Sequence, residues 1–325
     1  EANIKAVCIE SRPHPDFCGP GWWRDMDIIL DEAKKRNMKV WILDDSHCPT
    51  GYANGAMKEQ PDELCRQSIW CRYYDVKDKE EIHIDYEEVN VPREHPLNNL
   101  EKIIFGSETE KVFDDDSRIG VYAIRIDCES DVVNLEMWVT ENGLDWKAPE
   151  GEWRIYILYL SRNQGYHRNY INMMSMPSCR VLLDAVYEPH FERYKEEFGK
   201  TIAGFFSDEP ELGNGQLYGG ENYLGHDIDF PWSNELEMLL EEEIGSNYVE
   251  NMIYLWENQA GPEKIARTRY QYMNAVTRLV KKDFSEQIGK WCRNHHVEYI
   301  GHLIEDNNLH ARLGSSLGHY FRGLS

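Results

Sequence analysis

Short apolar runs followed directly by acidic residues are the feature that most constrains the fold. Between them, apolar residues recur at the spacing of an amphipathic helix, as they do from 22 to 36. Strands that alternate with helices over short connections predict βαβ units, and therefore a parallel sheet. The expected strands are residues 4–9, 39–43, 153–160, 201–206 and 297–304. We predict an α/β protein with a (β/α) barrel of the TIM type, truncated within these 325 residues.

Residues 62–150 have a different pattern, in which polar and apolar residues alternate with a period of two. Strands are expected at 81–91, 118–127 and 132–140, separated by charged turns. We therefore predict a barrel domain made of residues 1–61 and 151–325, and an inserted antiparallel β-rich subdomain made of residues 62–150.

Charge and composition narrow the classes of partner. The formal net charge is −23, so a basic surface for nucleic acid or anionic membranes is not expected, because phosphates would be repelled. No apolar run approaches the roughly 20 residues of a membrane-spanning helix. The eight cysteines form no CxxC pair, which favours reduced thiols and a cytoplasmic rather than a secreted protein. The oligomeric state stays open.

The acidic residues at the strand ends point to a reaction. In a (β/α) barrel the carboxyl ends of the strands meet at the face that holds the active site. Glycoside hydrolysis needs two carboxyl groups across the scissile bond. Glu209 is the predicted general acid, because it follows an apolar strand and burial beside Phe205 and Phe206 would raise its pKa. Glu305 is the predicted partner carboxylate.

Other residues are expected to bind the substrate. They lie at or near the predicted strand ends and offer charges, hydrogen-bonding groups or a ring that stacks on sugars. These residues are Glu10, Arg12, His14, Trp23, Asp44, Asp45, Asn163, Asp208, His302 and Asp306. Each acid taken alone is also compatible with a helix cap or a salt bridge.

Cofactor motifs are missing from the sequence. It contains no HExxH and no Cys/His zinc spacing, so no histidine-bound catalytic metal is predicted, and Ca²⁺ held by oxygen ligands is the candidate cofactor. It also has no Walker pattern, no GxGxxG after a strand and no GxSxG elbow. These absences disfavour a phosphate cradle and an α/β-hydrolase.

Four stretches carry a family resemblance: 10–17 (ESRPHPDF), 21–56, 204–214 (GFFSDEPELGN) and 301–322. They resemble bacterial glycoside hydrolases of the family 106 α-L-rhamnosidase type and, more distantly, the clan A barrels. The resemblance implies an inverting mechanism with two glutamates and a calcium ion, which Glu209 as acid and Glu305 as base would match. Clan A enzymes carry their acid at the end of the fourth strand, where Glu209 falls by predicted strand count. Asp208 stands where those enzymes usually have Asn.

These observations together predict a hydrolase of carbohydrate metabolism that cleaves an oligosaccharide or glycoside, for instance during polysaccharide degradation. Two alternatives remain open. The chain could be a carbohydrate-binding barrel relative without catalytic activity. It could also be a retaining glycosidase whose nucleophile lies beyond residue 325.

Overall fold

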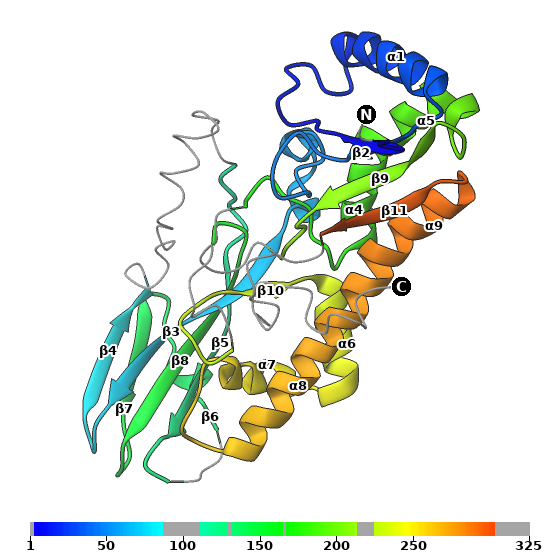
Figure 1. The fold of residues 1–325 in the computed structure, drawn as a ribbon. Coiled ribbons are helices and arrows are strands. Elements are labelled where there is room, and N and C mark those ends of the chain that lie inside the picture. Colours follow the sequence, from blue (N-terminus) through cyan, green and yellow to red (C-terminus); the bar gives the residue numbers. More distant parts are fainter. Residues whose placement is uncertain (1–2, 87–110, 129–131, 165–166, 213–223, 303–325) are drawn as a thin grey trace.

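The computed structural model describes residues 3–86, 111–128, 132–164, 167–212 and 224–302. A parallel sheet with helices packed along it occupies one end of the molecule, and an antiparallel sheet extends from it toward the other end (Figure 1). The large hydrophobic core runs through both parts, because it includes side chains from the parallel sheet, its helices and one face of the antiparallel sheet. The fold is therefore a mixed α/β arrangement.

Four of the five strands expected in the barrel do lie parallel in one sheet. They are β1 (Ala6–Ile9), β2 (Lys39–Leu43), β9 (Ile202–Asp208) and β11 (Glu298–His302), paired in that order. Their order in the sheet follows their order in the chain, as successive βα units require. In the part of the chain that the structure describes, β1 and β11 are the edges of the sheet, and no closed barrel is formed.

The two faces of this sheet differ. Ile42 and Phe205 are paired in register, are fully buried and lie on the face covered by helices, where the Phe205 ring stacks on Tyr187. Trp41 and Phe206 point to the opposite face and are half-buried. Because side chains alternate along a strand, every second residue in this sheet belongs to the helix-covered face.

Helices occupy the connections where helical spacing predicts them. α1 (Pro20–Lys35) joins β1 to β2, and α4 (Met176–Leu182) and α5 (Glu188–Tyr194) precede β9. α6 (Asn234–Ile244), α7 (Tyr248–Asn251), α8 (Pro262–Leu279) and α9 (Glu286–Asn294) lie between β9 and β11. One turn of π-helix joins α4 to α5, and another joins α8 to α9. No helix in the described ranges has the length and apolar character needed to cross a membrane.

The strand expected at 153–160 is not part of the parallel sheet, which corrects the prediction. β8 (Trp153–Ser161) pairs antiparallel with β3 (Gln67–Val76) and with β5 (Ser117–Arg125). Its side chains alternate between two cores: Leu158 enters the large core, and Ile157 a smaller one. A strand buried on both faces is a continuous apolar run in either kind of sheet, so its sequence does not reveal its partners.

The antiparallel sheet has the order β10-β3-β8-β5-β6, with β10 (Phe230–Trp232) and β6 (Val133–Asn134) at its edges. The strand expected at 132–140 is thus only two residues long and is followed by a 3-10 turn at Glu136–Trp138. A separate pair, β4 (Glu81–Asp85) and β7 (Gly143–Lys147), contributes Ile84 and Leu144 to the smaller core. Because β8 and β10 lie outside 62–150, the antiparallel sheet extends beyond the predicted insertion.

Candidate functional site

The carboxyl ends of the parallel strands bring several of the predicted residues together. Glu10 follows β1, Asp44 and Asp45 follow β2, Asp208 is the last residue of β9, and His302 is the last residue of β11. Glu209 comes directly after β9, which is the third strand of the sheet and not the fourth, because β8 belongs elsewhere. The two other predicted acids, Glu305 and Asp306, lie outside the described residues.

Arg12 connects the acids of β1 and β9. Its Nε and Nη2 donate to the two carboxylate oxygens of Glu10 at 2.6 and 2.7 Å, and its Nη1 donates to Oδ2 of Asp208 at 2.7 Å. This fork geometry suits guanidinium and no other cationic side chain. The hydrogen bonds from Arg12 lower the pKa of the Glu10 carboxyl, and the same contacts raise the pKa of Arg12.

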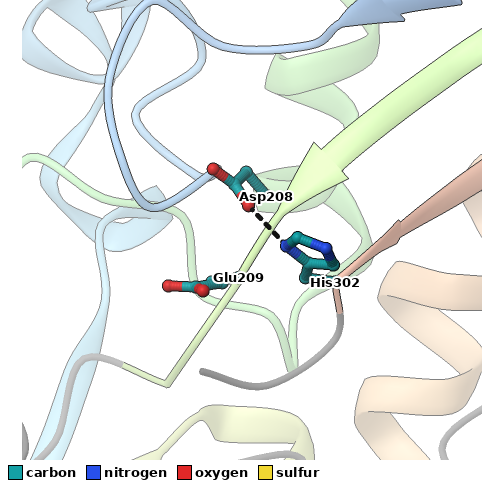
Figure 2. Close-up of side chains that lie close together, drawn as sticks. All are labelled: Asp208, Glu209 and His302. Atoms are coloured by element: carbon teal, nitrogen blue, oxygen red, sulfur yellow. Dashed lines mark hydrogen bonds and ion pairs between the residues drawn. The ribbon is translucent and has the colours of Figure 1, made fainter. Parts of the chain in front are cut away.

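Asp208, Glu209 and His302 form a compact cluster (Figure 2). The Nδ1 atom of His302 lies 3.0 Å from Oδ1 of Asp208, so both carboxylate oxygens of Asp208 have a partner. Glu209 has a φ of 50°, in the left-handed region that non-glycine residues seldom adopt, and its N–H donates to the carbonyl of His302 at 3.0 Å. Such backbone strain is often found at functional sites.

Asp44 is fully buried beneath this cluster and is not available to a substrate. Thr50 donates its hydroxyl to Oδ1 of Asp44 at 2.7 Å, and Tyr187 donates its hydroxyl to Oδ2 at 2.6 Å. Ser207 also donates its hydroxyl to Oδ2. Burial raises the pKa of Asp44 to about 7, although the hydroxyl donors oppose the shift. These contacts do not support the predicted role of Asp44 in substrate binding.

Asp45 is also fully buried, and it organises the loop after β2. Its carboxylate accepts hydrogen bonds from the backbone N–H groups of Gly51, Ala53 and Asn54 at 2.9, 2.8 and 3.0 Å. A longer contact of 3.3 Å comes from the N–H of His47. This carboxylate therefore holds a loop in place and does not face a substrate.

The remaining predicted residues lie in three different places. His14 lines a cavity of about 500 Å³ together with Glu10, Trp22 and Asp25, so this cavity borders the Glu10–Arg12 pair. Trp23 packs against His190 and Tyr194 of α5, among the helices. Asn163 is buried in the loop after β8, where it bonds the backbone of Phe113. The structure thus brings His14 toward the site, and leaves Trp23 and Asn163 away from it.

Sequence reasoning missed the hydroxyl groups that support the site. Thr50 accepts a hydrogen bond from the N–H of Asp208 at 2.9 Å, and its own N–H donates to the carbonyl of Asp208 at 2.8 Å. Tyr299 donates its hydroxyl to Ser207 at 2.8 Å. Single Thr, Ser and Tyr residues carry no pattern that marks such contacts. The sequence signal was confined to the acids at the strand ends.

A second network lies in the neighbouring loops. Nε2 of His167 lies 2.6 Å from Oε1 of Glu211, and its Nδ1 contacts the hydroxyl of Tyr52. The imidazole is almost fully buried and stacks on the ring of Tyr170. Tyr170 in turn donates its hydroxyl to the carbonyl of Thr50 and accepts from the N–H of Glu211. This network ties the loops that follow β2, β8 and β9 to one another.

The Asp208–Glu209–His302 cluster has side chains of the types that can ligate a metal ion. One ligand atom from each residue lies within 4.8 Å of the others. Calcium takes about six to eight oxygen ligands, whereas this set offers an imidazole and a carboxylate, Asp208, that Arg12 and His302 already engage. The described residues are therefore a poor match for the calcium ion that the resemblance implies.

Loss of the Arg12 fork should be visible in the titration of Glu10. Because Arg12 stabilises the ionised carboxylate, Arg12→Gln should raise the pKa of Glu10 toward its ordinary value of 4.5. NMR titration of ¹³C-labelled glutamate carboxyl groups measures this. Arg24→Gln is the control, because Arg24 pairs with Asp25. An unchanged Glu10 titration in Arg12→Gln would show that the fork does not persist in solution.

Comparisons with known proteins place the fold. No family model matches the chain, and a search of curated proteins finds no match either. Among solved structures, the chain is similar to a rhamnosidase from Novosphingobium sp. PP1Y, with a TM-score of 0.51 and 10% sequence identity. The likeness covers 93% of this chain and 42% of that one, so the chain spans less than half of the rhamnosidase. At this identity the likeness concerns the fold alone.

Proposed function

We propose that this chain carries the acid-bearing half of a glycoside hydrolase site, with Glu209 as the general acid. The observation that carries the proposal is the cluster at the carboxyl ends of the parallel strands, where Glu10, Asp208 and Glu209 gather around Arg12 and His302. In barrels and open α/β sheets alike, ligands bind at this end of the strands. The fold likeness to a rhamnosidase supports the same class of enzyme.

The contacts of each acid argue for Glu209 over its neighbours. Asp208 has both oxygens engaged, because Arg12 donates to Oδ2 and the Nδ1 atom of His302 lies against Oδ1. Asp44 and Asp45 are fully buried. Glu209 is half-buried and leaves the strand with left-handed backbone geometry, which directs it differently from the alternating residues of β9. It is therefore the acid best suited to give a proton to a leaving oxygen.

The proposed reaction uses two carboxyl groups. Glu209 protonates the oxygen of the departing group, while Glu305 takes a proton from the water that attacks the anomeric carbon. The oxygens of Glu10 and Asp208 already have partners, but each oxygen keeps a second lone pair, and Arg12 keeps further N–H groups. These remaining acceptors and donors are of the kind that bind sugar hydroxyls. The cavity beside Glu10, which His14 also lines, has room for part of the glycoside.

The proposed substrate is an α-L-rhamnoside. Hydrolysis of a panel of nitrophenyl glycosides by the purified protein tests this, and the α-L-rhamnoside should be released fastest. Binding of rhamnosides without any hydrolysis would favour the carbohydrate-binding alternative. If another glycoside were hydrolysed fastest, the proposed reaction would stand and the proposed substrate would be wrong.

The proposed arrangement of acid and base predicts inversion at the anomeric carbon. An attacking water between two carboxyl groups needs about 6.5–9.5 Å between them, whereas a covalent intermediate needs about 5–5.5 Å. We expect the first-formed sugar to have the opposite anomeric configuration from the substrate, as ¹H NMR during the first minutes of hydrolysis would show. A product of the same configuration would indicate retention, and Glu305 would then have to be a nucleophile or be replaced by one.

A further inference from the structure

The buried carboxylate of Asp44 has no role in the proposed reaction, although it sits next to the strand that carries the acid. Its partners are hydroxyl groups from three segments: Thr50 in the loop after β2, Tyr187 between α4 and α5, and Ser207 in β9. An ionised carboxylate can only accept hydrogen bonds. When Asp44 is ionised, each hydroxyl therefore directs its proton toward it, and this fixes the direction of the hydroxyl's lone pairs.

Thr50 connects the Asp44 carboxylate to the backbone of Asp208. Its hydroxyl proton points at Asp44, so a lone pair of the same oxygen is free to accept the N–H of Asp208, which lies 2.9 Å away. The backbone of Thr50 closes a second bond to the carbonyl of Asp208 at 2.8 Å. The peptide units on both sides of Asp208 are thus held from the loop after β2, immediately before the strained residue Glu209.

From these contacts we infer that Asp44, acting through Thr50, is a positioning residue that holds the backbone at Asp208 and Glu209 in its left-handed turn. The inference rests on the proposed function for its catalytic consequence, but its structural part stands alone. A misplacement of about 1 Å in a catalytic group can cost about a hundredfold in rate. Burial of this carboxyl group costs stability, whereas holding the backbone at Glu209 in place favours turnover.

Three variants test the connection from Asp44 through Thr50 to the backbone of Asp208. Thr50→Val keeps the shape of the side chain and removes the hydroxyl, while Thr50→Ser keeps the hydroxyl and serves as the rescue. Thr277→Val is the matched control, because Thr277 is another buried threonine, and its hydroxyl donates to the carbonyl of Met273 within α8. Hydrogen exchange of the Asp208 amide, by NMR or on peptides that span β9, measures the hold directly.

We expect the Asp208 amide to exchange at least about tenfold faster in Thr50→Val, and to stay near the wild-type rate in Thr50→Ser and Thr277→Val. In turnover, kcat should fall about ten- to a hundredfold in Thr50→Val with a smaller change in KM. Exchange that is unchanged in a folded Thr50→Val protein would overturn the inference, whatever the activity.

Asp44→Asn tests the charge itself. The pKa of Asp44 is raised from 3.8 to about 7, so the folded state holds the proton more tightly, and the contribution of Asp44 to stability is lost as pH rises through about 7. The charged neighbour is Asp45; Tyr187, Tyr299, Cys8 and Cys292 also face the group and are neutral there. The melting temperature of the unmodified protein should therefore decline between about pH 4 and 7, and Asp44→Asn should make this decline smaller. The same substitution should lower kcat about tenfold or more.

The outcomes separate the two proposals. If Glu209→Gln is fully active, the proposed function fails, while the exchange result at Asp208 still stands. If Glu209→Gln is inactive but Asp44→Asn has wild-type kcat, the reaction stands and the positioning role of Asp44 is wrong.

Discussion

Glu209→Gln should abolish hydrolysis of substrates with poor leaving groups while leaving the fold intact. Glutamine has nearly the same volume but cannot donate a proton to the leaving oxygen at neutral pH. General acid catalysis is typically worth about 10²–10⁴-fold, and we expect a loss of this size in kcat for an alkyl rhamnoside. A nitrophenyl rhamnoside needs less protonation, so its kcat should fall much less. Steady-state kinetics on the two substrates measures the difference.

The control for this substitution is Glu192→Gln, which makes the same chemical change at an exposed position of α5. Its kinetics should match those of the unmodified protein. Circular dichroism and the melting temperature verify that both variants are folded. If Glu209→Gln kept its turnover on the alkyl rhamnoside, another residue would have to be the acid.

Asp45→Ala should destabilise the protein strongly. The carboxylate is fully buried and accepts hydrogen bonds from the backbone N–H groups of four residues of one loop. Each buried donor left without a partner costs about 1–3 kcal/mol, and water that enters the site would recover part of this. We expect the free energy of unfolding to fall by roughly 3–5 kcal/mol, as measured by urea denaturation.

Activity should fall together with stability in Asp45→Ala, because the same loop carries Thr50 and Tyr52. Asp31→Ala is the control: Asp31 is an exposed acid of α1, paired with Lys34 at 3.2 Å, and its removal should change stability by less than about 0.5 kcal/mol. A small effect in Asp45→Ala would mean that the loop is held by contacts other than these hydrogen bonds.

Local patterns were sufficient for the βαβ unit at the start of the chain. Apolar runs at 4–9 and 39–43, with amphipathic spacing between them, correspond to β1, α1 and β2. These elements are specified by residues close in sequence, and a right-handed crossover leaves one arrangement for them. The acids after the strands were also readable, since each follows its strand directly. A parallel sheet was therefore the only assumption needed to predict that Glu10, Asp208 and Glu209 lie close together.

The partners of β8 could not be read in the same way. Its residues are apolar on both faces, and it lies between two cores. It pairs with β3, where the register partners Ser68 and Ser161 are 93 residues apart. Nothing local in such a run distinguishes a central strand of an antiparallel sheet from a barrel strand. Because the predicted barrel included β8, Glu209 was expected after the fourth strand, whereas it follows the third strand of the parallel sheet.

The side on which each acid lies was decided by tertiary structure alone. Asp44 and Asp208 both stand at the carboxyl end of a strand rich in apolar residues, and the sequence pattern does not distinguish them. In the register of β2 against β9, Asp44 falls on the helix-covered face with Ile42 and Phe205, while Asp208 falls on the opposite face with Phe206. Because side chains alternate, one position along a strand separates a buried carboxylate from one at the site. The sequence determined which carboxylates stand at the strand ends; register and helix packing decided which of them are buried.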